Sequence, residues 1–233
     1  MRLVFLNTYE AILKEPFENF LREEGRQTQV FCFQEATETV QALCQKVLPG
    51  FVPSFARKVL DERNAFPLAT YIRDDILVRE TQEIGRAFQD AGLGLRHRLR
   101  IGNREIDVAN IHGISHTSPG LDTKRDTPGR IIQSQAILDA FESSDCPVII
   151  GGDFNLLPDT ESMKLFSQSG YRDLIREYAI PTTRNHIAWD RFPKAEKYFY
   201  SDYVFVSPTV EVKGFSVPNI EVSDHLPLIL EVK

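Results

Sequence analysis

Residues 146–155 constrain the fold more than any other part of the chain. Their apolar run at 148–150 (Val-Ile-Ile) is typical of a strand buried on both faces. The two glycines that follow allow the backbone to turn sharply and to approach another group closely. Asp153 and Asn155 come next, and they share one face if the backbone stays extended. The segment therefore predicts a rigid strand that ends in polar groups, either at a reactive site or at a solvated glycine turn.

Hydrophobic spacing predicts strands and helices in both halves of the chain. The predicted strands are residues 2–6, 29–33, 52–55, 68–72, 76–84, 93–101, 105–111, 148–150, 198–206, 210–217 and 226–232. The predicted helices are residues 9–22 with a kink at Pro16, 37–47 capped by Thr37, 127–141 with Pro128 in the first turn, and 159–170. No repeat or long linker interrupts this pattern, which predicts a single α/β domain over residues 1–233.

A carboxylate, an amide or an imidazole stands at or near one end of most of these strands. Asn110 precedes His112 by two positions and so lies on the same strand face. Each such residue alone is more often a turn or cap residue. The set consists of Asn7, Glu35, Asn110, His112, Asp153, Asn155, Asp202, Asp224 and His225. Together these side chains are the inventory of a hydrolytic site with one hard cation.

Such an inventory suits the hydrolysis of a phosphodiester, an anion that resists attack by water. A hard divalent cation such as Mg²⁺ takes oxygen ligands and keeps several waters, so one or two carboxylates hold it. The cation neutralises charge on the phosphoryl group as a Lewis acid. A general base must deprotonate the attacking water. Neutral donors and a carboxylate-oriented imidazole must stabilise the charge that grows in the transition state.

The composition excludes several classes of protein. The net charge is −6 and the pI about 5.5, whereas proteins that coat nucleic acid or membranes are usually basic. Cys32, Cys44 and Cys146 lack metal-ligand spacing and suit a reducing compartment. No apolar run is long enough for a signal peptide or a membrane span. We therefore expect a soluble, cytoplasmic protein without stable membrane insertion, and we expect a monomer.

At its strand-end residues the sequence resembles the endonuclease/exonuclease/phosphatase superfamily, whose members include deoxyribonuclease I, apurinic endonucleases, tyrosyl-DNA phosphodiesterases, deadenylases, sphingomyelinases and inositol phosphatases. The most specific matches are residues 151–155 (Gly-Gly-Asp-Phe-Asn) and 223–225 (Ser-Asp-His), followed by 34–35 (Gln-Glu) and 201–207. The matches occur in the family's order along essentially the whole chain. The resemblance implies a four-layer α/β sandwich, in which two central, mostly antiparallel β-sheets are flanked by helices.

The resemblance also implies a metal site and a nucleophile. Glu35 is similar to the principal metal ligand of the family, with Asn7 beside it and Asp224 sharing the ion. The implied ion is Mg²⁺ or Mn²⁺. Asp153 is similar to the residue that positions or deprotonates the nucleophilic water.

Further residues would act on the phosphate. By the same resemblance, Asn155 holds the phosphate or the transition state, and His225 contacts the phosphoryl oxygens. Asp202 orients His225, and His112 adds a second imidazole donor. Asn110 is expected among the substrate-binding residues.

Two segments gather basic and aromatic side chains. They are the predicted loop 113–129 and residues 182–197, and they hold His116, Lys124, Arg125, Arg130, Arg184, His186, Trp189, Arg191, Phe192, Lys194 and Lys197. Such a mixture suits a nucleotide-containing substrate, through phosphate pairing and base stacking, with Arg130 and Arg184 as contacts. The alternative is solubility charge around a packed tryptophan.

Two other basic patterns have alternative interpretations. Arg130 and Gln133 resemble the Arg-and-Gln helix of tyrosyl-DNA phosphodiesterase-like members, although a solvated helix face would look the same. Arg96, Arg98 and Arg100 share one strand face, which predicts either a basic strip for a nucleic-acid backbone or an exposed sheet face.

The sequence thus predicts a divalent-metal-dependent phosphodiester hydrolase that acts on nucleic acid, either DNA or RNA, or on another nucleotide-containing phosphodiester. The predicted chemistry is in-line attack by a water that Asp153 activates. Two alternatives stay open. One is a phospholipid, sphingomyelin or inositol-phosphate phosphoesterase with the same site. The other is a catalytically inactive binding module that kept the fold.

Overall fold

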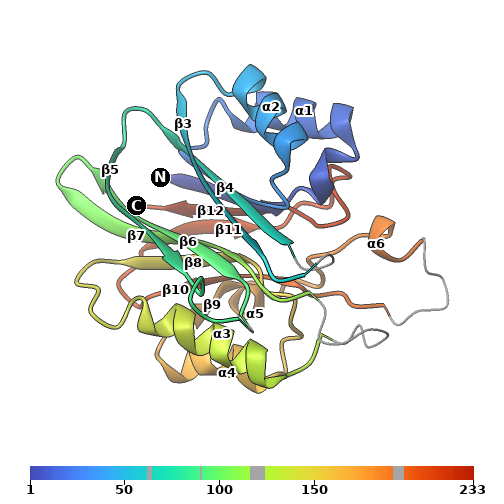
Figure 1. The fold of residues 1–233 in the computed structure, drawn as a ribbon. Helices are drawn as coiled ribbons and strands as arrows, with labels where there is room; N and C mark the ends of the chain where they lie inside the picture. Colours follow the sequence, from blue (N-terminus) through green and yellow to red (C-terminus); the bar gives the residue numbers. More distant parts are fainter. Residues whose placement is uncertain (62–64, 90, 116–123, 191–196) are drawn as a thin grey trace.

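Two six-stranded β-sheets pack face to face, and helices cover both outer faces (Figure 1). The computed structural model describes residues 1–61, 65–89, 91–115, 124–190 and 197–233. In Figure 1, α1 and α2 lie above the sheets, and α3 and α4 lie below them. The predicted four-layer α/β sandwich is therefore confirmed.

The first sheet, sheet A, has the strand order β11-β12-β1-β2-β4-β3. Its only parallel pair is β1 with β2, and its other four pairs are antiparallel. The strands are β1 (Arg2–Asn7), β2 (Val30–Gln34), β3 (Phe51–Val59), β4 (Ala65–Arg73), β11 (Val212–Ser216) and β12 (Leu228–Val232). The chain thus enters sheet A at its N-terminus and returns to it at its C-terminus.

The second sheet, sheet B, has the order β5-β6-β7-β8-β10-β9, again with one parallel pair, β7 with β8. Its strands are β5 (Leu77–Ile84), β6 (Leu93–Ile101), β7 (Arg104–His112), β8 (Val148–Asp153), β9 (Arg172–Asp173) and β10 (Asp202–Val206). The prediction of mostly antiparallel sheets is confirmed, because each sheet has a single parallel step.

The structure describes six α-helices, of which the first four overlap the predicted segments and the last two were not predicted. They are α1 (Lys14–Glu24), α2 (Glu38–Val47), α3 (Pro128–Asp139), α4 (Glu161–Gln168), α5 (Leu174–Glu177) and α6 (Ile187–Asp190). Thr127 caps α3, since its side chain accepts from the backbone N–H of Arg130. Thr37 stands at the N-cap of α2 but makes no capping hydrogen bond through its side chain. Among the described residues, no helix is long and apolar enough to cross a membrane.

The two sheets meet closely because glycine faces an aromatic ring across the interface. A Cβ on Gly151 would lie 2.7 Å from a ring carbon of Phe5, so only glycine lets β8 approach β1 at this point. Phe5, Cys32, Ile111 and Ile150 are among the buried side chains that fill this core. The close packing brings the ends of β1 and β2 next to the ends of β7 and β8.

The predicted helix 9–22 is wrong in its first part. Residues 9–11 form a 3-10 turn with positive φ, and the α-helix begins only at Lys14. The reason is local, since the backbone N–H of Tyr9 donates to Oδ1 of Asn7 and the chain turns back on the end of β1. Pro16 lies in the first turn of α1, where proline is tolerated, so the expected kink does not follow.

The predicted strand 198–206 begins only at Asp202. The residues before it instead run beside Thr183, whose backbone N–H donates to the carbonyl of Phe199 and whose Oγ1 accepts from the backbone N–H groups of Ser201 and Asp202. The alternating pattern of residues 198–201 therefore does not correspond to a β-strand.

The prediction that the arginines of β6 form a basic strip open to a nucleic-acid backbone is also wrong for Arg96 and Arg98. Arg96 and Arg98 both donate to the carboxylate of Asp107, which is fully buried. The guanidinium of Arg96 also donates to the carbonyl of Ala140 and lies 4.9 Å from the ring centroid of Phe141. Both arginines therefore join β6 to β7, and they are not free to bind a nucleic-acid backbone.

Candidate active site

Sheet B presents three of the predicted site residues in one row. Asp153 ends β8, and the strand register pairs it with His112 at the end of β7 and with Asp202 at the start of β10. Paired residues on neighbouring strands have side chains on the same face of a sheet. Each of the three is at most 3% exposed. The alternation of apolar and polar residues predicts which strand face carries each side chain. The pairing register between the strands decides that the three residues are neighbours.

Sheet A adds two more residues from the ends of its parallel strands. Nδ2 of Asn7 donates to Oε1 of Glu35 and to Oδ2 of Asp153, both at 3.0 Å. The Oδ1 atom of Asn7 accepts from the backbone N–H of Tyr9 at 3.1 Å. The amide nitrogen therefore faces the carboxylates, and Asn7 bridges them across the space between the two sheets.

The backbone at these strand ends adopts conformations that are rare for most residues. Gly152 has a φ of 135°, and a Cβ there would lie 2.2 Å from the carbonyl oxygen of Ile111. Glu35 and Asn155 have φ values of 52° and 56°, in the left-handed region. Such strain concentrates at functional sites, where the surrounding structure holds it in place.

Asp153 is the most heavily bonded carboxylate of the site. Its Oδ1 accepts from Oγ of Ser201 at 2.6 Å and from the backbone N–H of Asn155 at 2.9 Å, and its Oδ2 accepts from Asn7. Burial alone would raise the pKa of Asp153, but His225, Lys124 and His112 together hold it well below its usual range. Asp153 is therefore a carboxylate at neutral pH.

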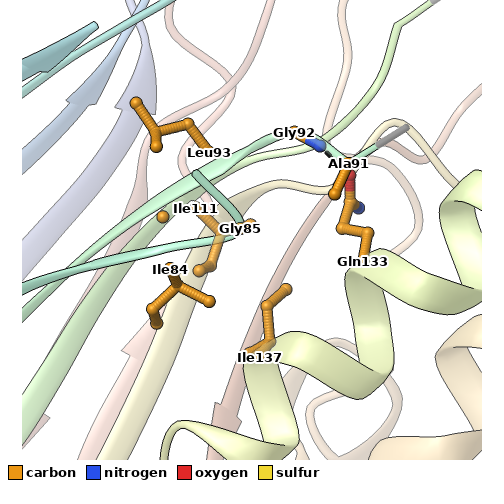
Figure 2. Close-up of a pocket in the computed structure, with 9 residues that line it drawn as sticks. Ile84, Gly85, Ala91, Gly92, Leu93, Ile111, Gln133 and Ile137 are labelled. Atoms are coloured by element: carbon orange, nitrogen blue, oxygen red, sulfur yellow. Dashed lines mark hydrogen bonds between the residues drawn. The ribbon is translucent and has the colours of Figure 1, made fainter. Parts of the chain in front are cut away.

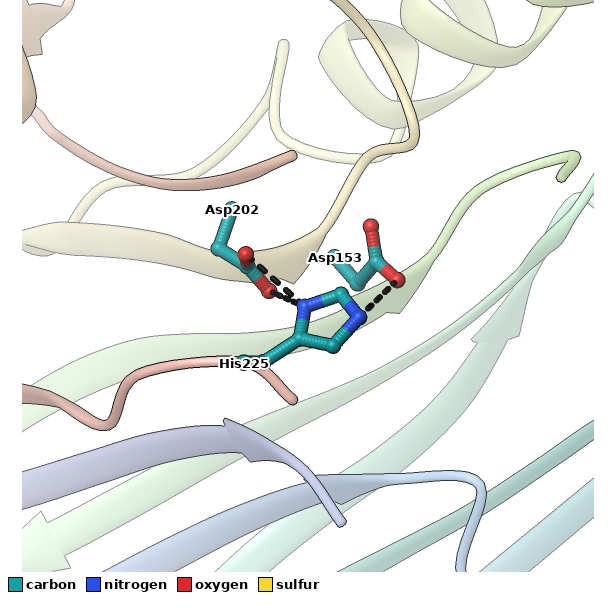
Figure 3. A group of neighbouring side chains, drawn as sticks. All are labelled: Asp153, Asp202 and His225. Atoms are coloured by element: carbon teal, nitrogen blue, oxygen red, sulfur yellow. Dashed lines mark hydrogen bonds and ion pairs between the residues drawn. The ribbon is translucent and has the colours of Figure 1, made fainter. Parts of the chain in front are cut away.

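His225 lies between two aspartates (Figure 3). Its Nδ1 donates to the carboxylate of Asp202 at 2.9 Å, and its Nε2 lies 3.7 Å from Oδ2 of Asp153. Burial and Arg184 lower the pKa of His225, but the adjacent carboxylates outweigh them and raise it. Burial raises the pKa of Asp202. The arrangement fixes one ring nitrogen on Asp202 and leaves the other turned toward Asp153.

Asp224 is held beside this pair. Oδ2 of Asp224 accepts from Nη2 of Arg184 at 2.6 Å, and its Oδ1 lies 3.8 Å from Nε2 of His225. Oγ of Ser223 donates to the carbonyl oxygen of Asn7 at 2.7 Å and accepts from the backbone N–H of His225. The Ser-Asp-His segment is therefore tied to the end of β1, which explains why a serine stands there.

Two predicted substrate contacts lie deeper in the structure. Asn110 is fully buried, and its Nδ2 donates to the carbonyls of Phe33 and Ala69 while its Oδ1 accepts from Gln34. It therefore joins β7 to sheet A beneath the site. His112 packs edge-on against Phe66 with ring centroids 5.2 Å apart, and burial lowers its pKa to about 4. His112 is thus a neutral imidazole next to Asp153.

The helix residues Arg130 and Gln133 do not form a solvated face. The fully buried guanidinium of Arg130 donates to the backbone carbonyls of Ile114, Ser115 and Arg125. Oε1 of Gln133 accepts from the backbone N–H groups of Gly92 and Ile114, at the edge of a small apolar pocket (Figure 2). Both side chains hold the loops beside β7. The expectation of an exposed helix face is therefore wrong.

Three contributors to the site escaped sequence reasoning. Nζ of Lys124 donates to Oδ1 of Asn155 at 2.7 Å and to Oγ of Ser201 at 2.9 Å. Thr183 fixes the backbone of residues 201 and 202. The sequence predicts Lys124 only as a basic loop residue that suits a nucleotide, and it places Ser201 inside the matched segment 201–207 without a role. No local pattern marks Thr183.

The donors around Glu35 fit a hard cation. Glu35 is half-buried, and burial raises its pKa to about 7. Among the described residues, no basic side chain forms an ion pair with it, so a cation would supply the missing counter-charge. Asp153, Asp202 and His225 also offer ligand atoms within 4.8 Å of one another. Both carboxylate oxygens of Asp202 already face Nδ1 of His225, which favours a hydrogen-bonded pair there.

Several predicted basic and aromatic residues lie outside the described residues, namely His116, Arg191, Phe192 and Lys194. Of the others, Lys197 lies 5.6 Å from the ring centroid of Trp189, and Phe199 packs edge-on against the same tryptophan. Phe199 is 46% exposed. Trp189, Lys197 and Phe199 form the α6 cluster, named after the helix that carries Trp189 and that lies to the right of the sheets in Figure 1.

Solved structures with the same fold cover the whole chain. Mannosyl-6-phosphatase from Bacteroides thetaiotaomicron superposes with a TM-score of 0.77 at 17% identity, covering 100% of this chain and 99% of the other. The human Nocturnin catalytic domain with bound sulfate gives 0.69 at 18% identity, covering 100% and 93%. Humanized D. rerio TDP2 gives 0.72 at 14% identity, covering 100% and 98%.

Sequence comparison identifies the family directly. No curated protein sequence matches the chain significantly. The family described as Endonuclease/Exonuclease/phosphatase matches residues 10–225, which include Glu35, Asp153 and His225. The chain therefore belongs to the endonuclease/exonuclease/phosphatase family.

Proposed function

We propose that the protein hydrolyses a phosphodiester in nucleic acid or in another nucleotide-containing molecule, with a divalent metal ion. Members of its family are phosphoesterases. The observation that carries the proposal is the position of Asp153, an ionised carboxylate between the bridging amide of Asn7 and the imidazole of His225. The site draws residues from both ends of the chain, which supports a single domain over residues 1–233.

Asp153 acts as the base in this proposal. Its Oδ1 accepts from Ser201 and from the Asn155 backbone, so the carboxylate cannot rotate. Oδ2 is the atom that takes the proton from the attacking water, because it faces the space between the sheets beside Asn7 and His225. A base must already be ionised to accept a proton, and the lowered pKa of Asp153 supports this role.

Glu35 would hold the metal ion, and Asp224, whose charge helps to raise the pKa of Glu35, would share it. Family members generally use a divalent metal. Oxygen donors are what Mg²⁺ and Mn²⁺ prefer. Of the four carboxylates of the site, Glu35 is the one for which the described residues supply no basic partner. When bound, the ion would neutralise charge on the phosphoryl oxygens. The Asn7 amide would keep Glu35 and Asp153 at a fixed separation.

His225 and Asn155 would stabilise the charge that develops on the phosphoryl oxygens. Asp202 holds Nδ1 of His225, so the proton-bearing Nε2 would point at the substrate. The pKa of His225 is raised by its carboxylate neighbours, which favours the charged imidazolium. Donors that are fixed before the reaction stabilise a transition state without reorganisation.

The substrate class rests on the α6 cluster. Trp189 and the half-exposed Phe199 offer ring surface for base stacking, and Lys197 adds positive charge. A second candidate is a sugar phosphate monoester, because a mannosyl-6-phosphatase superposes over 99% of its length.

A metal-dependent substrate panel tests the proposal. Its substrates are nicked and abasic duplex DNA, single-stranded DNA, RNA, sphingomyelin, inositol phosphates, mannose 6-phosphate and bis-p-nitrophenyl phosphate. We expect Mg²⁺ or Mn²⁺ to support hydrolysis, EDTA to abolish it, and Asp153→Ala and Glu35→Ala to remove it. The exposed Asp75→Ala is the matched control and should keep full turnover. Wild-type turnover in both site variants would refute the enzyme assignment.

The same panel separates the substrate classes. Trp189→Ala should raise KM for nucleic acid while leaving hydrolysis of bis-p-nitrophenyl phosphate unchanged, because only the former has bases to stack. Preference for mannose 6-phosphate over every diester would replace the nucleic-acid proposal with the second candidate.

A further inference from the structure

The Lys124 side chain lies inside the candidate site although it comes from the long loop between β7 and α3. It is only 6% exposed. Its ammonium donates to Oδ1 of Asn155 and to Oγ of Ser201, at 2.7 and 2.9 Å. Burying an ammonium group costs free energy unless it is well hydrogen-bonded, so the burial of Lys124 indicates that its hydrogen bonds have a role.

Both partners of Lys124 bond Asp153 in turn. Ser201 accepts from the ammonium and donates its own hydroxyl proton to Oδ1 of Asp153 at 2.6 Å. The backbone N–H of Asn155 donates to the same oxygen at 2.9 Å. The Lys124 ammonium is therefore linked to Oδ1 of Asp153 in two ways, through the hydroxyl of Ser201 and through Asn155.

The lysine also decides how the Asn155 amide is turned. Oδ1 of Asn155 accepts from Lys124, and Nδ2 donates to the carbonyl of Gly113 at 3.1 Å. An ammonium cannot accept a hydrogen bond, so only the amide oxygen can face it.

We propose, resting on the function proposed above, that Lys124 is a positioning residue that fixes Asp153 Oδ1 through Ser201 and Asn155. Oδ2, which accepts a hydrogen bond from Asn7, is then the oxygen that takes the proton from water. Lys124 transfers no proton and binds no substrate in this role. Its hydrogen bonds within the protein direct the ammonium toward Asn155 and Ser201.

The backbone around Lys124 is anchored without its side chain. The carbonyl of Lys124 accepts from the backbone N–H of Leu157 at 2.8 Å. Two residues later, Asp126 accepts from the backbone N–H groups of Glu161 and Ser162 at the start of α4. A substitution at Lys124 should therefore leave the path of this segment intact.

Steady-state kinetics of the metal-loaded enzyme on the best substrate of the panel test the proposal. Lys124→Met keeps the length of the side chain and removes its charge and donors. We expect kcat to fall by about 10- to 100-fold with KM changed less than twofold, because the lost bonds are charge-assisted. Ser201→Ala should lower kcat similarly, and the double variant should be little worse than either single variant, because both act on the same oxygen.

Chemical rescue separates positioning from a structural role. Lys124→Ala leaves room for a small amine, so ethylammonium should restore part of kcat, whereas tetramethylammonium at the same ionic strength should not, since it has no N–H donor. The exposed Lys164→Met is the matched control and should leave kcat unchanged.

Three results would overturn the inference. They are wild-type kcat in Lys124→Met, a rise in KM without a fall in kcat, and a loss of kcat with a large fall in melting temperature that ethylammonium does not rescue. The second would make Lys124 a substrate contact, and the third a structural residue. If the wild-type enzyme hydrolyses nothing in the panel, the proposed function fails as well, so the two failures are distinguishable.

Discussion

Asp107 and Asp153 are both buried aspartates in sheet B, on neighbouring strands, but their surroundings differ. Asp107 accepts from the guanidinium groups of Arg96 and Arg98 and from Oγ of Ser144. Asp153 accepts mainly from neutral donors, and its Oδ2 also faces the imidazole of His225. Burial opposes ionisation of both, yet both pKa values are lowered.

The difference separates a structural carboxylate from the one that we propose as the base. Two fixed positive charges saturate Asp107, so it can only hold β6 against β7. Asp153 lies five residues further along the register, about 17 Å away at the strand repeat, and its Oδ2 faces the amide of Asn7 and the imidazole of His225. Burial and a lowered pKa are thus common to both groups, and the nature of the hydrogen-bond donors distinguishes them.

The largest expected effect is on turnover at Asp153. Asp153→Asn should lower kcat by about 10³- to 10⁴-fold, because an amide cannot accept the proton of the attacking water. Its melting temperature should change much less than that of Asp107→Asn. Steady-state kinetics and thermal melting measure the two effects. A variant with both turnover and stability unchanged would contradict the assignment of Asp153 as the base.

At Asp107 we expect the opposite result, a loss of stability without a loss of turnover. Asp107→Asn leaves two guanidinium groups without their shared counter-charge, so the free energy of unfolding should fall by about 3–5 kcal/mol in urea titrations. Turnover per folded molecule should stay at the wild-type level. Asp145 is the matched control, since it pairs with the same Arg98 from an 82% exposed position. Asp145→Asn should cost less than about 0.5 kcal/mol. Equal losses of unfolding free energy in Asp107→Asn and Asp145→Asn would contradict the structural role of Asp107.

A smaller loss of kcat is expected at Asp202, which in our proposal acts on the substrate only through His225. Asp202→Asn should lower kcat by about 100-fold, because the ring loses the carboxylate that orients it and favours its charge. The pH profile of kcat should also change, which a purely structural role would not produce. The exposed pair of His186 and Asp190 gives the control, and Asp190→Asn should leave kcat and its pH profile unchanged. An unchanged profile in Asp202→Asn would count against the orienting role.

The last effect depends on pH and concerns His97, a buried histidine on β6. Burial lowers its pKa to about 4, whereas an unfolded histidine titrates near its ordinary value of about 6.5. Between these two pH values the unfolded chain binds the proton and the folded chain does not. Stability therefore falls as the pH drops, by at most about 1.4 kcal/mol per pH unit. His97→Gln should lose less stability from pH 6.5 to 4 in urea titrations. Parallel curves for the two proteins would contradict this expectation.

Much of the fold could be predicted because most strands carry their own pattern. Runs such as residues 148–150 and 226–232 read correctly, since alternation and turn residues are local signals. The errors lie where tertiary contacts override them. Residues 9–11 turn back to bond Asn7, and residues 198–201 pair with Thr183 instead of a sheet. Likewise, Arg130 has the spacing of an exposed helix residue but is fully buried beneath a loop.

The sequence by itself determined which chemical groups stand near the strand ends, from Asn7 to His225, because each lies within four residues of a strand end along the chain. Only the tertiary structure decided how they are bonded. The Asn7 bridge, the Asp202–His225 pair and the Lys124 contacts join residues 23 to 146 positions apart. Strand register and the meeting of two sheets set these distances, and neither is encoded in local alternation.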